Sequence, residues 1–212
     1  DYFGPKMRKM IEEVESICSS RNSLLTTQDS RIILVHCWRG GMRSGAISWL
    51  LDLYGFKVYT LIGGYKKFRN YVLDTFKLPF HLNILGGYTG SGKTELLKAL
   101  KERGERVIDL EDIAKHKGSA FGSIGMPQQP GQEMFENILA LSLHEFRDQR
   151  SGAGTNPSDL MPHPSGIWLE DESQRIGHVN IPGDFWQNMR QSPLYFLDIP
   201  FEERLKHIVQ EY

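Results

Sequence analysis

Gly87-Tyr-Thr-Gly-Ser-Gly-Lys-Thr94 is the stretch of sequence that decides the fold of the second half of the chain. It fits the pattern Gly-x-x-x-x-Gly-Lys-Ser/Thr and lies between an apolar run at residues 81–85 and a helical pattern at residues 93–102. Such a turn aims backbone N–H groups and a helix N-terminus at one point, which favours phosphate oxygens. The residues that we expect to bind the phosphate are Gly87, Gly90, Ser91, Gly92, Lys93 and Thr94, and the Thr94 hydroxyl is also the predicted Mg²⁺ ligand.

Strands and helices alternate on both sides of this phosphate-binding loop, or P-loop. Apolar runs predict strands at residues 81–85, 106–110, 167–170 and 194–198. Helical periodicity predicts helices at residues 93–102, 131–147, 182–189 and 201–210. This order is typical of a parallel sheet, so we expect an α/β, P-loop NTPase-like domain over residues 80–212. Residues 151–165 are rich in Gly, Pro, Ser and Asn and are expected to form an irregular loop.

Acidic residues end two of the predicted strands. A P-loop site usually has a second acid that holds a metal-bound water at the end of a neighbouring strand. Glu170 and Asp171 follow one apolar run, and either is expected to play this role. Asp109 and Glu111 end the preceding strand in the same way. The alternative, that these carboxylates are simply solvated at a strand end, stays open.

The first half of the chain carries a second motif, in which a cysteine follows a short apolar strand at residues 31–36. It reads His36-Cys37-Trp-Arg-Gly-Gly-Met-Arg43-Ser44, and Ser44 is the expected N-cap of a helix over residues 45–54. Successive N–H groups of such a loop turn toward the sulfur, lower the thiol pKa and build an anion site. We therefore predict Cys37 as a nucleophile and Arg43 as a side chain that grips two oxygens of an anion.

Shorter signals complete the organisation of the first half. Apolar side chains recur at helical spacing over residues 7–18. They predict a helix with one buried face, on which Cys18 is a core residue. Residues 57–61 predict a strand, Gly63 and Gly64 a turn, and residues 65–76 a basic helix. Pro79 is the predicted boundary between a domain at residues 1–79 and a domain at residues 80–212.

The cysteine loop alone fits two classes of protein. His-Cys-x5-Arg-Ser is typical of cysteine-dependent phosphatases, whereas rhodaneses use the same architecture to hold sulfur or selenium on the cysteine. The second half alone would also suit a small P-loop kinase or a nucleotide-gated binding module. The residues of each motif taken singly leave these alternatives open.

Composition limits the class of protein. The 212 residues are 40% hydrophobic and 24% charged with a net charge of −1, which suits one large or two small globular domains. No stretch reaches the roughly 18 apolar residues that a membrane span requires, and two cysteines are too few for a disulfide framework, so we expect a cytoplasmic protein without a membrane partner. The chain opens at Asp1 and stops at Tyr212 within amphipathic patterns, from which we expect truncation at both ends.

Taken together, the motifs resemble the tRNA 2-selenouridine synthase family, in which a rhodanese-like domain precedes a P-loop domain. The resemblance covers most of the chain, and the combination of a rhodanese-type loop with a P-loop about fifty residues later is uncommon. It rests on residues 37–44, 62–66, 86–97, 109–111, 116–122, 129–130 and 170–177, which occur in the family's order and spacing. For residues 1–79 the resemblance implies the C-terminal part of a rhodanese-like domain.

The resemblance implies an enzyme that replaces the sulfur of wobble 2-thiouridine in tRNA with selenium from selenophosphate. The family first attaches a geranyl group from geranyl diphosphate to the thio-base, which makes the sulfur a leaving group. By this likeness Cys37 would bear or deliver selenium, and Arg39 and Arg43 would bind selenophosphate. Residues 87–94 would hold the diphosphate or a nucleotide phosphate, together with Mg²⁺.

Basic and aromatic side chains near the cysteine loop are candidates for contact with tRNA. Basic side chains bind phosphates, and aromatic rings stack on unpaired bases. A solvated helix face is the alternative interpretation for each of them. The candidates are Lys57, Lys66, Lys67 and Arg69 for phosphates, with Tyr65 and Phe68 for stacking.

Overall fold

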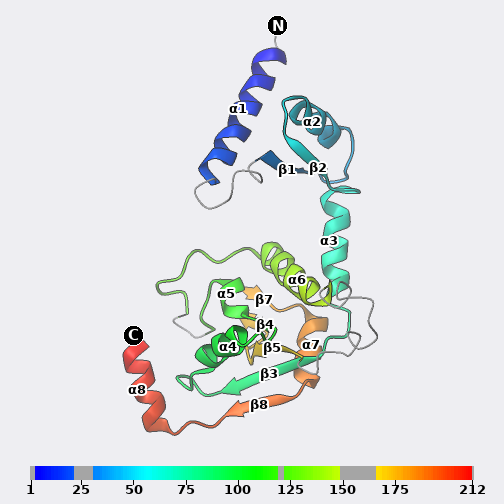
Figure 1. Ribbon diagram of the computed structural model, residues 1–212. Coiled ribbons are helices and arrows are strands. Elements are labelled where there is room, and N and C mark those ends of the chain that lie inside the picture. Colours follow the sequence, from blue (N-terminus) through cyan, green and yellow to red (C-terminus); the bar gives the residue numbers. More distant parts are fainter. Residues whose placement is uncertain (1–2, 22–30, 119–121, 149–165, 212) are drawn as a thin grey trace. The chain divides into compact units, whose positions relative to one another are not determined.

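A computed structural model describes residues 3–21, 31–118, 122–148 and 166–211 (Figure 1). The chain divides into two compact units, one comprising Asp1–Tyr71 and the other Val72–Tyr212. Each unit contains its own parallel sheet. Within the described residues, no helix combines the length and the apolar character that a membrane span needs. The predicted irregular loop at residues 151–165 lies outside the described residues.

The first unit contains a strand-helix-strand motif. Strand β1 (Ile32–Val35) lies parallel to β2 (Lys57–Thr60), with Ile32 paired to Lys57, and α2 (Met42–Leu53) connects them. Both predicted strands are therefore present. Helix α1 (Phe3–Arg21) precedes the motif, and α3 (Gly64–Thr75) begins after β2. Leu51 of α2 and Phe56, which directly precedes β2, are buried in this unit.

Two expectations for the first unit were wrong in detail. The predicted buried face of α1 is buried only at Ile11, whereas Met7 and Ile17 are exposed and Cys18, predicted as a core residue, is only half-buried. Helix α2 begins at Met42 instead of residue 45, and Gly41 is its N-cap. The extended backbone of Gly41 (φ −109°, ψ −154°) starts the helix directly after it, so Ser44 lies in the first turn and does not cap the helix.

The second unit is built on a four-stranded parallel sheet, which confirms the predicted α/β architecture. The strand order is β4-β5-β3-β8, and β3 is a central strand with a largely buried sequence. Register pairs Leu85 of β3 with Glu170 of β5, so the carboxyl ends of these two strands meet at one edge of the sheet. The strands are β3 (Leu82–Gly87), β4 (Val107–Ile108), β5 (Ile167–Glu170) and β8 (Leu194–Leu197).

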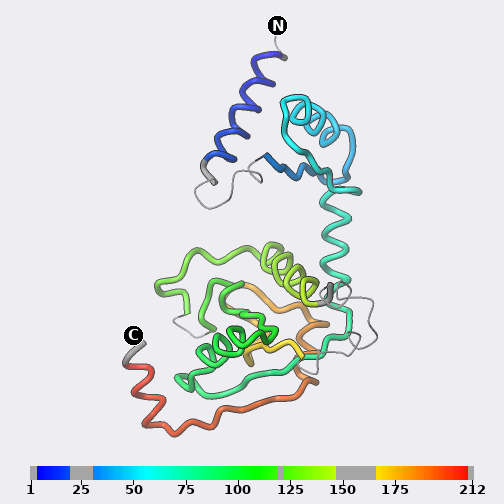
Figure 2. Tube along the Cα trace, in the orientation of Figure 1, coloured from blue at the N-terminus to red at the C-terminus, as the bar shows by residue number. Residues whose placement is uncertain are grey.

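Helices follow the strands in the alternation that the sequence predicts, as the trace in Figure 2 shows. Apolar side chains of α4 pack on the sheet, where Leu97 joins a buried cluster with Leu85 and Val107. This packing fixes α4 directly behind the loop that follows β3. The helices are α4 (Lys93–Glu102), α5 (Leu110–Ala114), α6 (Gln132–Asp148), α7 (Gly183–Gln191) and α8 (Phe201–Glu211).

Four short elements differ from the prediction. The strand predicted at residues 106–110 covers only Val107–Ile108, because Asp109 turns the chain into the five-residue helix α5. A small antiparallel pair, β6 (Arg175–Ile176) with β7 (Val179–Asn180), was not predicted. A strand of two residues and a helix of five residues are too short to produce a clear pattern in the sequence.

Candidate functional site

The P-loop joins the carboxyl end of β3 to the first turn of α4. Gly92 is the N-cap of α4 and has a left-handed backbone (φ 78°), a conformation that glycine adopts without strain. The amides of the first turn have no intrahelical acceptors, so the positive end of the helix dipole opens at the loop. Such a helix start favours anions, and phosphate binding by residues 87–94 stays a prediction.

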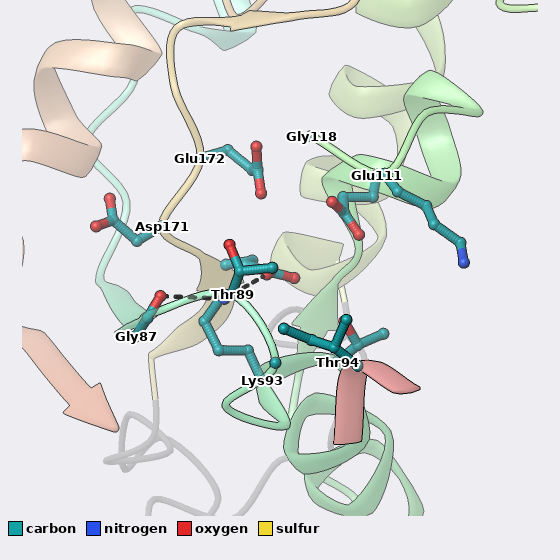
Figure 3. A pocket seen from close by; sticks show the side chains of 12 residues that line it. Gly87, Thr89, Lys93, Thr94, Glu111, Gly118, Asp171 and Glu172 are labelled. Carbon is teal, nitrogen blue, oxygen red and sulfur yellow. Dashed lines mark hydrogen bonds and ion pairs between the residues drawn. The ribbon is translucent and has the colours of Figure 1, made fainter. Parts of the chain in front are cut away.

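Lys93 lies across the P-loop and is held by two partners (Figure 3). Its Nζ donates a hydrogen bond to the carbonyl oxygen of Gly87 over 3.2 Å and lies 3.3 Å from Oε1 of Glu170. The side chains of Lys93 and Glu170 are only 14% and 8% exposed. The ammonium is therefore positioned inside the loop, and its charge is balanced by a carboxylate from the neighbouring strand.

A pocket of about 260 Å³ opens beside the P-loop. Its walls carry polar and charged groups, which suits a charged phosphate ligand more than an apolar one. Glu111 and Glu172 project into the same space and face each other in Figure 3. The lining residues are Gly87, Thr89, Gly90, Lys93 and Thr94 from the loop and α4, with Glu111, Lys117, Gly118, Glu170, Asp171, Glu172 and Ile208 from other segments.

Three carboxylates converge in this pocket. One oxygen each from Glu111, Glu170 and Glu172 lies within 4.8 Å of the others. Burial raises the pKa of Glu111 to about 8, and the charges of Glu170 and Glu172 add to the effect. Burial likewise raises the pKa of Glu172 to about 7, and it raises the pKa of Glu170 against the opposing charge of Lys93. Such a set of hard oxygen donors fits Mg²⁺, and a divalent cation would relieve the mutual repulsion.

Glu172 is a site residue that the sequence analysis did not select. In an extended chain, residues i and i+2 share one face, so Glu172 points to the same side as Glu170. Asp171 lines the pocket but forms an ion pair with Arg190 of α7, whose guanidinium stacks on the Trp186 ring at 4.4 Å. The alternation of side chains in an extended segment was the signal in the sequence that separates Glu170 and Glu172 from Asp171.

Asp109 and Glu111 also have different roles. The Asp109 carboxylate accepts a hydrogen bond from the amide of Asp112 over 2.8 Å and so caps α5. Glu111, in the first turn of the same helix, lines the pocket. Of these two predicted residues, the structure brings Glu111 to the P-loop and uses Asp109 to orient the helix that carries it.

Helix α8 packs on the outer part of the P-loop. The guanidinium of Arg204 donates to the carbonyl oxygen of Thr89 over 3.3 Å and to that of Ile199 over 3.1 Å, and it stacks on the Tyr88 ring at 4.8 Å. A Cβ atom on Gly90 would lie 2.7 Å from the Arg204 carbonyl oxygen. The glycine is therefore required by this close approach as well as by its φ of 76°. No pattern in the sequence linked α8 to the loop.

Cys37 lies in a separate site in the first unit, where the loop between β1 and α2 surrounds its sulfur. The Gly41 amide donates to Sγ over 3.2 Å, and the Ser44 hydroxyl lies 3.3 Å from Sγ. The Ser44 hydroxyl has the largest effect in lowering the pKa of Cys37 to about 6, followed by the Gly41 amide, and burial opposes them. The amides of Ser44 and Arg39 lower this pKa further. A large fraction of the thiol is therefore thiolate at neutral pH.

Several side chains of the cysteine loop and its flanks are exposed. Arg39 and Arg43, the predicted anion-binding arginines, lie exposed on the loop and on the first turn of α2. His36 is exposed as well, but its ring stacks on Tyr65, with ring centroids 5.6 Å apart. This stacking gives His36 a packing role and connects the loop to α3.

Comparison with known protein families and curated proteins shows which family the chain is similar to. The family described as "tRNA 2-selenouridine synthase AAA domain" matches residues 80–212. A tRNA 2-selenouridine synthase of Azotobacter vinelandii is 37% identical over 182 residues, which cover 84% of this chain and 44% of the relative. Proteins of the same name from Cupriavidus pinatubonensis and Hydrogenovibrio crunogenus are 35% and 39% identical, over 84% of this chain and 45% and 47% of their own lengths.

The extent of these matches determines what they establish. The aligned region includes more than four fifths of the chain, but it spans less than half the length of these relatives. The family match alone covers well over half of the 212 residues and includes the P-loop, the three converging carboxylates and α8. This chain therefore belongs to the tRNA 2-selenouridine synthase family.

Proposed function

We propose that this chain is the part of a tRNA 2-selenouridine synthase that carries its reactive thiol and its diphosphate site. The reaction replaces the sulfur of wobble 2-thiouridine in tRNA with selenium from selenophosphate. The observation that carries the proposal is the presence, in one chain of this family, of an activated Cys37 in a ring of donors and a P-loop beside a carboxylate pocket. A tRNA substrate also implies a cytoplasmic location.

The cysteine site is the proposed place of selenium transfer. We assign Cys37 to bear or deliver the selenium, and Arg39 and Arg43 to bind the selenophosphate anion. The lowered pKa of Cys37 supports this assignment, because the thiolate is the nucleophilic form. The parallel β1–α2–β2 arrangement, with the loop at the carboxyl end of β1, supports a rhodanese-like domain for the first unit.

The P-loop pocket is the proposed site of geranyl diphosphate, whose geranyl group is first attached to the thio-base. The glycines and Ser91 of residues 87–92 would offer their amides to the diphosphate, and Lys93 would leave Glu170 to contact it. Thr94 and the carboxylates of Glu111, Glu170 and Glu172 are the groups that would hold Mg²⁺. When bound, the cation would neutralise the diphosphate as a leaving group. A nucleotide phosphate in this site is the alternative ligand.

Mass spectrometry of tRNA nucleosides tests both assignments. The intact protein is incubated with 2-thiouridine tRNA, selenophosphate and geranyl diphosphate, and the digest is analysed for geranylated and selenated nucleosides. We expect Cys37→Ser to abolish 2-selenouridine while the geranylated nucleoside still forms, and Lys93→Ala to abolish both. Cys18→Ser is the matched control and should leave both products unchanged. Selenium incorporation that survives Cys37→Ser would reject the role of the thiol.

A second function has support from the cysteine loop alone. The Cys-x5-Arg spacing and the lowered pKa of Cys37 also suit a cysteine-dependent phosphatase or a plain sulfurtransferase with an accessory P-loop site. Robust turnover of a phosphoester, or of thiosulfate with cyanide, in the absence of tRNA would favour this function. Phosphoryl transfer from ATP to a small acceptor that disappears in Lys93→Ala would instead favour a P-loop kinase.

A further inference from the structure

The first turn of α3 binds the back of the Cys37 loop. The amide of Tyr65 donates to the carbonyl oxygen of Cys37, and the amide of Lys66 donates to that of Trp38, each over 2.9 Å. These amides are among the helix N-terminal donors that have no acceptor inside their own helix. The loop carbonyls therefore accept hydrogen bonds from these two amides of α3, and α3 in turn fixes the direction in which those carbonyls point.

The direction of a carbonyl determines the direction of the next amide. The Trp38 carbonyl and the Arg39 N–H belong to one planar trans peptide, so they point to opposite sides. Because Lys66 holds the Trp38 carbonyl toward α3, the Arg39 N–H faces the interior of the loop. The Arg39 amide is one of the hydrogen-bond donors that lower the pKa of Cys37. The inward-facing ring of amides thus depends on a contact outside the loop.

Two glycines make this contact possible. A Cβ atom on Gly64 would lie 2.3 Å from the Gly40 nitrogen and 2.4 Å from the Cys37 carbonyl oxygen. A Cβ atom on Gly40 would lie 2.6 Å from the Gly64 nitrogen. Both residues have positive φ, 67° for Gly40 and 66° for Gly64. The backbones meet face to face at a distance that any side chain would prevent.

We propose that Gly64 is a positioning residue for Cys37, because its lack of a side chain lets the first turn of α3 orient the peptides that surround the sulfur. This inference rests on the proposed function of the cysteine loop, which it deepens. It also accounts for the glycine at position 64, far along the chain from Cys37, to which the proposed chemistry assigns no role. Gly64 acts through the loop backbone and does not itself touch a substrate.

The pH dependence of Cys37 alkylation tests the proposal. The intact protein is treated with iodoacetamide between pH 5 and 10, and modification of the Cys37 peptide is followed by mass spectrometry. We expect a midpoint near pH 6 for the unmodified protein. Gly64→Ala should raise this midpoint by about one unit or more, because a displaced loop loses donors to the sulfur. Gly45→Ala is the matched control, since a Cβ at Gly45 in α2 would meet no described atom within 4 Å outside the backbone of its own helix, and its midpoint should not change.

Hydrogen exchange provides a second measurement that needs no variant. In the unmodified protein the Tyr65 and Lys66 amides should exchange at least tenfold more slowly than in an unstructured peptide, although they lie in a first helical turn. Fast exchange at both amides, or a Gly64→Ala midpoint equal to that of the unmodified protein, would overturn the positioning role. A midpoint near 9 in the unmodified protein would instead remove the activated thiol from the proposed function. The exchange rates of the Tyr65 and Lys66 amides would then show by themselves whether α3 binds the loop.

Discussion

Lys93 of the P-loop and Glu170 of β5 form a buried ion pair, with Nζ 3.3 Å from Oε1. The register of the parallel sheet places the carboxyl ends of β3 and β5 side by side, so the pair follows directly from the strand order. A phosphate in the proposed site would therefore compete with Glu170 for the Lys93 ammonium. A divalent cation on the carboxylates would release the lysine, and metal binding would then be coupled to diphosphate binding.

Removal of the lysine charge should weaken diphosphate binding. We expect Lys93→Ala to raise the Kd of pyrophosphate, measured calorimetrically with Mg²⁺, by about 10- to 100-fold, because a charge-assisted hydrogen bond is lost. Lys98→Ala is the control, since Lys98 lies exposed on the same helix and does not line the pocket. Equal affinities for the two variants would contradict a phosphate-binding role for Lys93.

The Glu170 carboxylate should have the opposite effect when Mg²⁺ is absent. We expect Glu170→Gln to bind metal-free pyrophosphate several-fold more tightly than the unmodified protein, because the competing charge is gone. The same variant should lose most of the gain in affinity that Mg²⁺ provides, because one of the three converging carboxylates is missing. Titration of pyrophosphate with and without Mg²⁺ measures both effects. An unchanged metal dependence would show that Glu170 is not a ligand.

The sequence predicted the elements that carry strong local signals. Helix α4 and strand β5 have the predicted bounds because the P-loop motif fixes the start of the helix and three apolar residues before Glu170 mark the strand. Cys37 was selected because a cysteine after an apolar strand, followed by glycines and arginines, has few structural interpretations. These are features in which neighbours along the chain determine the result.

Contacts between distant segments could not be predicted in this way. The seating of α8 on Gly90 and the contact of Gly64 with Gly40 depend on tertiary packing that leaves no periodic signal. Ser44 shows the same limit on a smaller scale. Its position suggested an N-cap, but the chain enters α2 three residues earlier, and the hydroxyl bonds to the Gly41 carbonyl and approaches the sulfur.

The carboxylate pocket should make stability depend on pH. The pKa of Glu111 rises from 4.5 to about 8 in the folded protein, so the folded state keeps a proton that the unfolded state loses. Its contribution is fully present below pH 4.5 and is lost as the pH rises toward 8. We expect the free energy of unfolding to fall by about 2 kcal/mol across this range, after allowance for partial exposure.

Urea denaturation at pH 5 and pH 8 measures this effect. Glu111→Gln should flatten the pH dependence, because the amide does not titrate, whereas Glu102→Gln, at an exposed position of α4, should not. Mg²⁺ should restore stability at pH 8, since the cation replaces the proton among the three carboxylates. A stability that rises between pH 5 and pH 8 in the absence of metal would contradict the assignment.

The hydroxyl of Ser44 should set the reactivity of the thiol. A hydroxyl has one proton, so it donates to the thiolate only when it leaves the Gly41 carbonyl, which keeps its bond from the Gly45 amide over 3.1 Å. We expect Ser44→Ala to raise the pKa of Cys37 above its value of about 6 and to slow alkylation at pH 7 several-fold. Ser48→Ala is the control, because the buried Ser48 hydroxyl in α2 has no hydrogen-bond partner among the described residues. Its alkylation profile should match that of the unmodified protein.

The contact of α8 with the P-loop should affect ligand binding more than folding. Arg204 holds the Thr89 carbonyl and covers the Tyr88 ring, so its loss should let the loop sample conformations in which the amides do not converge. We expect Arg204→Ala to raise the Kd of pyrophosphate about 3- to 10-fold with a small change in Tm. Lys206→Ala on the same helix removes only an exposed ion pair with Glu203 and should change neither quantity. If Arg204→Ala lowered Tm strongly and left the Kd unchanged, α8 would stabilise the fold without organising the anion site.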